Sequence, residues 1–430
     1  MLVIKAKASH HLKHLGQHLK LDLHYLAREG FWTTLKFGIV TIGSILTTIA
    51  FGNLLPKETY GIYSYLLSLG STLAFLTISG SSTAIIRSVA RGYEEVANYA
   101  FNFQLRYNTI AGLVVLSSAI YYGYKGNWLF AGAMTILALA VPLSTSYFSY
   151  EPILIGSKNF KKLTQISVLT TSVNTAVIIG TIFITQNPLF LILNTTLTSL
   201  ITNYLVYKNV SSNIKTNLPT QEQIAEFRRT SFNLTGAGLL SSAANYLDKI
   251  LLFQVAGPAN LAIYGFAIAG PEKLKGLIKN WISTILPKLA QKSVEETRQI
   301  FYKRLIYLLL TGIALAMVYI IVAPFLFRLF LPKYISSVTY SQAYALSLAI
   351  TPAMVYIGNI FNGLNLLRAV YISGIISQIT RILIIVIMGL LFQTWGLVFG
   401  AIISSTINTL FNIIIWEVES RRLVKKNHAT

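Results

Sequence analysis

Long apolar runs alternate with short polar gaps along most of this chain, and the gaps differ sharply in charge. Of the 35 Lys and Arg residues, 24 lie in the two terminal segments and in every second gap, whereas only three lie in the gaps between them. An excess of Lys and Arg on short loops marks the cytoplasmic side of a membrane. The alternation therefore predicts a multi-span membrane protein of one fixed orientation, with both termini in the cytoplasm.

The composition excludes a soluble fold. Soluble domains are typically about a quarter charged, but only 11% of these 430 residues are charged, 54% are hydrophobic and the mean hydropathy is +0.60. The chain has no Cys, which rules out disulfides, thiolate metal sites and a cysteine nucleophile. We expect no metal and no cofactor. The first apolar run is too long for a cleavable signal, and we expect a multi-pass protein of a bacterial cell inner membrane.

A membrane-spanning helix needs about 20 apolar residues, and this length predicts an all-α protein with about twelve transmembrane helices in two six-helix lobes. The expected helices are 31–55, 61–86, 98–122, 128–150, 163–186, 188–207, 231–256, 260–287, 305–330, 338–363, 369–392 and 395–417. The expected parts of the chain are an amphipathic interfacial segment (1–30), an N-terminal lobe (31–207), a cytoplasmic linker (208–230), a C-terminal lobe (231–417) and a basic cytoplasmic tail (418–430).

The turn after the first span resembles the turn after the seventh. With one gap allowed, Pro56 matches Pro258 and Tyr65 matches Phe266, and between them Gly61 matches Ala262, Ile62 matches Ile263 and Tyr63 matches Tyr264. The two spans are expected to run in the same direction, so the halves would be parallel repeats about an axis along the membrane normal. Such repeats are typical of alternating-access transporters.

The same stretches carry a family resemblance. The turn 55–63 (LPKETYGIY), the small-residue run 80–84 (GSSTA) and the segment 245–252 (NYLDKILL) with 262–264 (AIY) resemble the polysaccharide-exporter branch of the multidrug/oligosaccharidyl-lipid/polysaccharide (MOP) flippases, which includes the Wzx O-antigen flippases. The resemblance implies two six-helix lobes in a V around a central cavity. It also implies a substrate of undecaprenyl diphosphate carrying a glycan repeat unit, and partners such as a polysaccharide polymerase and chain-length machinery.

Eight basic residues lie inside the expected spans, where an ionisable group costs about 2.5–3.5 kcal/mol on insertion scales and usually faces a cavity or a partner. They are Lys36, Arg106, Lys249, Lys273, Lys275, Lys279, Arg328 and Arg381. Only Asp248 and Glu272 are acidic at comparable depth. This cationic surplus suits an anionic substrate.

Two groups of these residues are the main candidates for substrate binding. Arg381 is expected near the midplane with Gln378 on the same helix face, either pointing into a cavity or bonded to another span. Glu272, Lys275 and Lys279 fall on one stripe of a helix, with Lys273 about 100° away. The stripe faces either substrate or water, unless Glu272 and Lys275 pair with each other and Lys279 extends to the interface.

Three further candidates are less constrained. Arg106 and Lys36 are expected about 10 Å inside the cytoplasmic face, where either could meet phosphate; for Lys36, extension to the interface explains the position equally well. Asp248 could bind a coupling ion, but a structural bond, for example to Arg328, is the favoured interpretation. Arg328 itself is expected near the outer interface as an anchor.

These observations favour a lipid-linked oligosaccharide flippase. An enzyme is not expected, because the outward turns are too short to hold catalytic groups outside the membrane. The alternative is a cation-coupled multidrug exporter of the same superfamily, whose members commonly use an acid in the first span or an acidic cluster in a lobe. Here the first span contains Lys36 and no acid. Membrane lipids are expected partners, and nucleic acid is not.

Overall fold

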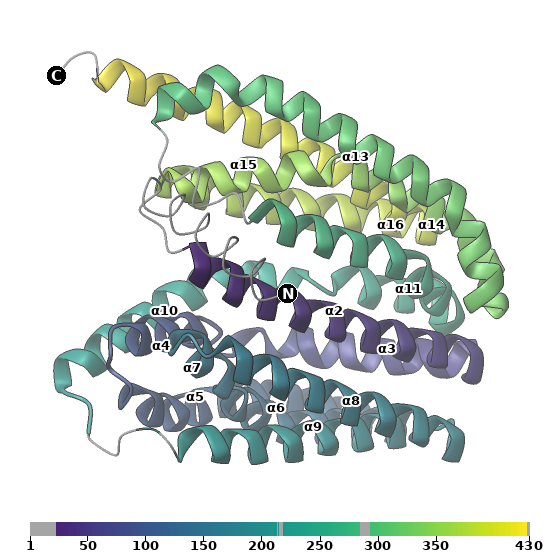
Figure 1. Cartoon of the computed structure of the whole chain (residues 1–430). Coiled ribbons are helices and arrows are strands. Elements are labelled where there is room, and N and C mark those ends of the chain that lie inside the picture. The colour runs from purple at the N-terminus through teal and green to yellow at the C-terminus, as the bar shows by residue number, and fades with distance from the viewer. Residues whose placement is uncertain (1–22, 213, 215–217, 284–292, 428–430) are drawn as a thin grey trace, which may run out of the picture.

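The computed structural model describes residues 23–212, 214, 218–283 and 293–427, and within these ranges the chain is helical with no strand (Figure 1). Most of the predicted amphipathic segment 1–30 therefore lies outside the described residues, as do parts of the linker 208–230 and of the tail 418–430. The described helices form two groups, one from each half of the chain.

The first group is the N-terminal lobe. Asn127, Asn159 and Asn187 begin three of its helices, because each side chain accepts a hydrogen bond from a backbone N–H in the first turn, at 3.2, 3.2 and 2.9 Å. These caps stand in the polar gaps that separate the apolar runs. The elements are α2 (Leu23–Leu54), α3 (Lys57–Leu73), η1 (Ala74–Leu76), α4 (Gly80–Ala90), α5 (Val96–Tyr124), α6 (Trp128–Tyr147), α7 (Tyr150–Gly156), α8 (Phe160–Ile184) and α9 (Pro188–Ser211).

The second half of the chain contains two long helices that are each interrupted by one non-helical residue. These residues are Gly257, with φ of 81°, and Gln393, with φ of 50°. The elements are α10 (Gln221–Ala244), α11 (Leu247–Ser283), α13 (Val294–Phe330), η2 (Pro332–Ser337), α14 (Val338–Ala345), η3 (Leu346–Ala349), α15 (Thr351–Gly363) and α16 (Leu367–Asn427).

Eight helical stretches of the described chain are long and apolar enough to cross a membrane, and nine if the bent pair Lys57–Leu76 and Gly80–Ala90 is one span. Two of the eight are 62 and 58 residues long and contain the interruptions at Gly257 and Gln393. The chain is therefore a multi-pass membrane protein.

The structure differs from several of the predicted elements. The expected helix 61–86 is broken, and its two parts meet at 62°. The expected helix 338–363 consists of α14, η3 and α15, because the chain tightens to 3-10 geometry at Leu346–Ala349 ahead of Pro352. The linker ends ten residues earlier than expected, since the capping box of Thr220 and Gln223 begins α10 at Gln221.

The packing of α10 also departs from the predicted lobe boundary. Although α10 follows the linker, it packs against α4 of the N-terminal lobe. Gly80 allows this close approach: a Cβ at Gly80 would collide with the backbone of Ser231 and Thr235. The backbone N–H of Gly80 donates to Thr235 Oγ1 at 3.0 Å, and Arg91 pairs with Glu226 at 2.5 Å. The first helix after the linker therefore contacts the N-terminal lobe as well as α16 of the C-terminal lobe.

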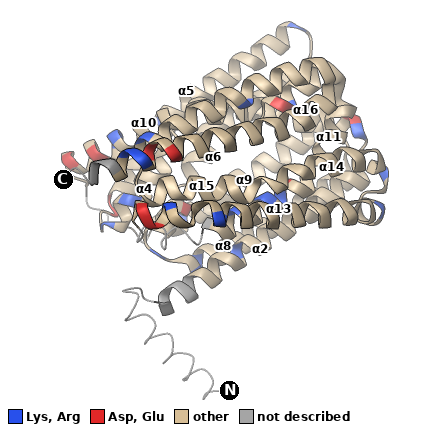
Figure 2. Cartoon of the chain, turned by 90° about the horizontal axis from the view of Figure 1, so that it is seen from above, with Lys and Arg blue, Asp and Glu red and all other residues tan. Residues whose placement is uncertain are grey.

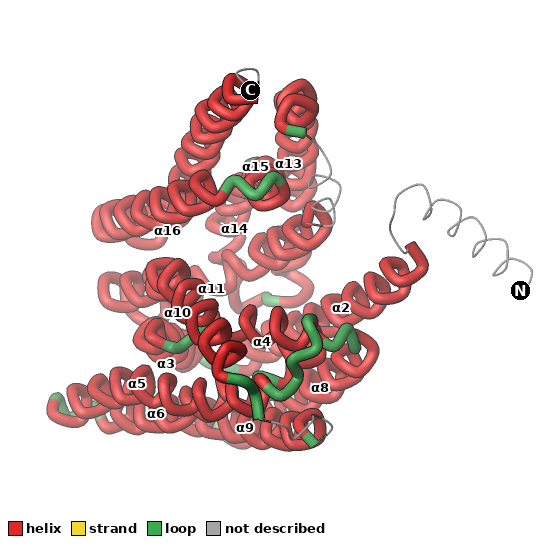
Figure 3. Tube along the Cα trace, turned by 90° about the vertical axis from the view of Figure 1, so that its left-hand side faces the viewer, coloured by secondary structure: helices red, strands yellow, loops and turns green. Residues whose placement is uncertain are grey.

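Charged residues gather mainly at one end of the helices, near the C-terminus (Figure 2). We call this the basic end; it holds Arg91, Lys162, Arg298 and Arg421. The opposite end, called the turn end, holds the turns that contain Lys57, Lys125 and Lys333. Seen along the helices, α11 and α13–α16 form one group and α2–α9 with α10 form the other (Figure 3).

The two lobes contact each other at the turn end, through the two similar turns. A Cβ at Gly61 would collide with the carbonyl group of Pro258, so α3 and α11 approach backbone to backbone. The rings of Tyr60 and Phe266 lie 4.6 Å apart between centroids. Asn53 Nδ2 donates to the carbonyl oxygen of Phe330 at 2.7 Å. Three residues of the repeat, Gly61, Pro258 and Phe266, thus take part in the inter-lobe contact.

Candidate functional site

The centre of the candidate site is an acid, a base and a phenol on two helices of the C-terminal lobe. Lys275 Nζ lies 2.7 Å from Glu272 Oε1, one turn earlier on α11. The hydroxyl of Tyr344, on α14, donates to the same carboxylate oxygen at 2.5 Å. The Lys275 ammonium also lies 3.1 Å from the Tyr344 hydroxyl and 4.2 Å from the ring centroid. Lys275 is therefore partnered on three sides.

Arg381 brings a second cation to this group from another helix. It lies on α16 and interacts electrostatically with Glu272, Lys275 and Tyr344, but it forms no ion pair with a described residue. Glu272 is 47% exposed at its side chain, whereas Lys275 is 20% exposed. The Glu272 carboxylate is thus open to the surroundings, although it is paired with Lys275.

Gln378 lies one turn before Arg381 on α16. Its Oε1 atom is buried and has no hydrogen-bond partner among the described residues. An unpaired buried acceptor is costly. The predicted pairing of the guanidinium and this amide toward one ligand stays a prediction.

Asp248 is buried in the C-terminal lobe, and its partner differs from the one considered in the sequence. The Tyr264 hydroxyl donates to Asp248 Oδ2 at 2.7 Å. The other oxygen, Oδ1, is buried without a hydrogen-bond partner in the described part of the chain. The proposed bond to Arg328 is wrong: Arg328 is exposed and forms no ion pair with a described residue. A phenol on the neighbouring helical segment provides the bond at less electrostatic cost than a second buried ion.

The other two candidate lysines of α11, Lys273 beside the stripe and Lys279 on it, have different surroundings. Lys273 donates to Ser44 Oγ on α2, so it links the two lobes. Lys279, two turns beyond Glu272, is exposed and has no partner among the described residues. The alternative in which Glu272 and Lys275 pair matches the observed ion pair, and Lys279 is the unpaired cation of the stripe.

Lys36 and Arg106, the two candidates in the N-terminal lobe, also have different surroundings. Lys36 forms an ion pair with Glu151 of α7 at 2.6 Å, with the two side chains 22% and 23% exposed. This lysine therefore fastens α2 to α7. Arg106 on α5 is exposed, and the described residues offer it no hydrogen bond or ion pair. The structure does not bring Arg106 into the group around Lys275.

The sequence missed the tyrosines of the site. Tyr264 and Tyr344 are among 24 Tyr residues and stand in apolar runs, so nothing in their spacing marks them. A buried polar chain in the N-terminal lobe was missed as well: Gln104 Nε2 donates to Ser81 Oγ at 2.6 Å, and Ser149 Oγ donates to Gln104 Oε1 at 2.6 Å. Within the described residues, no group of three or more His, Cys, Asp or Glu could hold a metal ion.

Comparison with solved structures identifies the class of fold. The chain matches an inward-facing multidrug resistance MATE family transporter of the MOP superfamily with a TM-score of 0.64 and 13% identity, covering 91% of this chain and 99% of that one. It matches the lipid II flippase MurJ in an inward closed conformation with a TM-score of 0.65 and 16% identity, covering 89% and 87%. A third match is a MOP superfamily transporter from Pyrococcus furiosus, with a TM-score of 0.55 and 14% identity over 91% of this chain and 95% of that one. The fold is therefore that of the MOP superfamily of membrane transporters.

The family can be stated more narrowly from the sequence. Residues 26–292 match the model of the polysaccharide biosynthesis protein family, and the chain belongs to that family. The match confirms the resemblance to the polysaccharide-exporter branch. No curated protein sequence matches the chain.

Proposed function

We propose that this protein is a flippase that moves undecaprenyl-diphosphate-linked glycan repeat units from the inner to the outer leaflet of a bacterial inner membrane, for O-antigen or a related surface polysaccharide. The observation that carries the proposal is the group of Lys275, half-exposed Glu272 and Tyr344, with Arg381 as a further cation on the adjacent helix α16. Family membership supports a polysaccharide product, and the similarly folded lipid II flippase MurJ supports a lipid-linked substrate.

The chemistry of these two cations suits a diphosphate. A guanidinium presents a planar fork to phosphate oxygens, and an ammonium contributes a compact point charge. In the structure, the Glu272 carboxylate forms an ion pair with the Lys275 ammonium. An incoming diphosphate would exchange this carboxylate for phosphate oxygens, and the return of Glu272 to Lys275 would favour release. Arg106, Lys279 and Gln378 would act around this pair or on the path toward it, whereas Lys36 and Lys273 would hold α2 to its neighbours.

The mechanism we propose is alternating access across twelve spans with both termini in the cytoplasm. The contacts of Asn53, Gly61 and Tyr60 close the turn end, which the basic residues assign to the outer side. Binding would take place from the basic end, and separation of these contacts would open the opposite side. The polyprenyl tail would stay in the lipid while the head group crosses.

Asp248 is the proposed site of ion coupling, with Glu272 as a second candidate. Asp248 is buried and has one oxygen bonded to Tyr264 and one without a partner among the described residues. Such a carboxylate is suited to binding a proton or a monovalent cation during the cycle. The same observation favours the second candidate function, a cation-coupled multidrug exporter, which would bind cationic drugs in place of the lipid diphosphate.

Deletion of the gene separates these functions. We expect lipid-linked glycan to accumulate on the cytoplasmic face and surface polysaccharide to be lost, with both restored by the wild-type gene and neither by the Arg381→Ala variant at equal protein level. Persistence of surface polysaccharide without accumulation, together with increased drug sensitivity, would support the exporter. A polymerase and chain-length machinery would act on the product after transfer.

A further inference from the structure

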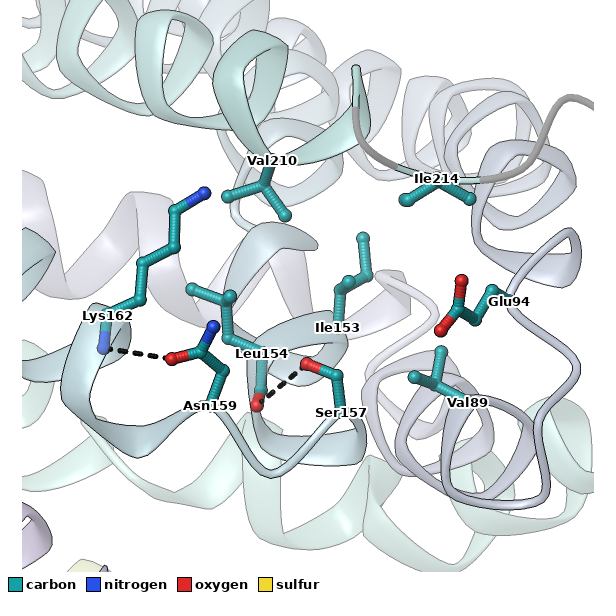
Figure 4. Close-up of a pocket in the computed structure, with 9 residues that line it drawn as sticks. All are labelled: Val89, Glu94, Ile153, Leu154, Ser157, Asn159, Lys162, Val210 and Ile214. Carbon is teal, nitrogen blue, oxygen red and sulfur yellow. Dashed lines mark hydrogen bonds between the residues drawn. The ribbon is translucent and has the colours of Figure 1, made fainter.

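A cavity of about 240 Å³ lies at the basic end of the N-terminal lobe, apart from the group around Lys275 (Figure 4). It is enclosed by the ends of α4, α7, α8 and α9 and by the segment that joins α4 to α5. Its apolar wall includes Val89, Ile153 and Leu154, which are buried members of the lobe core. The cavity is thus lined by both apolar and polar residues.

Two opposite charges line the cavity without meeting. Glu94 and Lys162 lie on opposite sides of it (Figure 4). Neither side chain has a hydrogen bond or ion pair with a described residue, although both are only partly exposed. Asn159 lies beside Lys162, and its Oδ1 accepts the backbone N–H of Lys162 at 3.2 Å, which leaves its Nδ2 as a donor. One side of the cavity therefore offers cationic and neutral donors, and the other offers a carboxylate.

This separation of charge selects a dipolar ligand. A purely anionic ligand would be repelled by Glu94, and a purely cationic ligand by Lys162. A ligand with both charges can satisfy both groups at once, through charge-assisted hydrogen bonds. The carboxylate accepts hydrogen bonds, so an ammonium that carries N–H groups fits better than a quaternary amine, which has none to donate.

The surface of α8 connects the cavity to the hydrocarbon region. Leu169 lies seven residues after Lys162, on the same helix face and about 10 Å farther along the axis. Its side chain is 60% exposed. Leu169 therefore offers an exposed apolar contact to chains attached to a group in the cavity.

We propose that this cavity binds the phosphoethanolamine head group of a phospholipid in the cytoplasmic leaflet. The phosphate lies at Lys162 and the Asn159 amide, and the ammonium lies at Glu94. The choice of leaflet rests on the orientation given under the proposed function; the choice of ligand does not.

The test measures lipid retained by the purified full-length protein after extraction from vesicles that contain equal parts of phosphatidylethanolamine, phosphatidylglycerol and phosphatidylcholine, by native mass spectrometry. We expect selective retention of phosphatidylethanolamine. Glu94→Gln and Lys162→Gln should each reduce this retention by about tenfold, because each removes a charge-assisted hydrogen bond. The matched controls Glu222→Gln and Lys161→Gln change exposed residues outside the cavity and should leave it unchanged.

Three results would overturn the proposal. Equal retention of the three lipids in wild-type protein would remove the selectivity on which it rests. Loss on Lys162→Gln with no loss on Glu94→Gln would indicate a simple phosphate site. Competition by soluble O-phosphoethanolamine with no retained lipid would reject the lipid as the source. A melting temperature equal to that of the wild type verifies that each variant is folded. The measurement involves no transport, so its failure is distinguishable from failure of the flippase proposal.

Discussion

At the scale of single residues, the ion pair of Lys275 and Glu272 makes a prediction that distinguishes a binding lysine from a structural one. Glu272→Gln removes the competing charge, so the affinity for a polyprenyl diphosphate analogue should rise about fivefold, or about 1 kcal/mol. Lys275→Ala should abolish binding. Fluorescence titration of the purified variants measures both. Lys161→Ala serves as control, because this lysine is exposed on α8 and lies outside the group around Lys275. An unchanged affinity in Glu272→Gln would contradict the proposed exchange of the Glu272 carboxylate for phosphate oxygens at Lys275.

Lys36 gives a second residue-scale prediction, on stability alone. Lys36→Ala leaves Glu151 partly buried and unpaired, which should cost about 1–2 kcal/mol and lower the melting temperature in detergent. The double variant Lys36→Met with Glu151→Leu should recover most of the loss, because no charge remains to be satisfied. A double variant less stable than Lys36→Ala would contradict this role. If Lys36→Ala lost transport while keeping wild-type stability, Lys36 would instead have a role in substrate binding.

The sequence revealed the charges of the site but not their partners. Lys275 and Arg381 could be found because a charge inside an apolar run is visible from composition and depth. Tyr344 and Tyr264 could not, since a tyrosine in a span is ordinary and its partner lies on another helix. The same limit explains why Arg328 was proposed for Asp248: the choice among residues on different helices depends on packing that spacing does not encode.

At the scale of helices, the starts capped by asparagine were more predictable than the interruptions. The asparagine caps stand in polar gaps that are plain in the sequence, whereas the break in the second span and the 3-10 segment before Pro352 lie within continuous apolar runs. The placement of α10 was missed for a related reason. Gly80 had been noted as part of a small-residue run, but its contact with Ser231 and Thr235 is tertiary.

The contact between α3 and α11 carries the helix-scale prediction. Gly61→Ala adds a methyl group where the carbonyl of Pro258 lies, so the turn end should separate at a cost of about 1–3 kcal/mol. Hydrogen–deuterium exchange should then increase in the segments around Gly61 and Pro258. Gly123→Ala is the matched control, because its Cβ would make only ordinary contacts. Equal exchange in the two variants would show that the lobes are not held together at Gly61.

At the scale of the whole molecule, the proposed orientation would account for much of the net charge of +21, and substrate binding for a smaller part. The lobes meet through contacts such as Asn53 with Phe330 and Lys333 with the carbonyl oxygen of Asn53 at 2.5 Å. Because the chain has no Cys, Asn53→Cys and Lys333→Cys can be joined by a cleavable bifunctional thiol reagent without other changes.

Such a link should stop export by holding the turn end closed, and cleavage should restore it. Surface polysaccharide is measured in cells treated with the reagent, first with the link intact and again after it is cleaved. Each single cysteine variant controls for modification alone. Undiminished export in the linked protein would mean that these contacts do not separate during transport.

The most direct test of the proposed function is a transfer assay with purified protein in liposomes loaded with undecaprenyl-diphosphate-linked glycan in the inner leaflet. Appearance of the glycan at the outer surface is followed with an added glycan-binding lectin. We predict transfer by the wild-type protein, and rates close to those of protein-free liposomes for a Lys275→Ala and Arg381→Ala double variant that reconstitutes equally well. Equal rates for the wild type and the double variant would contradict the assignment of these cations to the substrate. A wild-type rate equal to that of protein-free liposomes would contradict the flippase function itself.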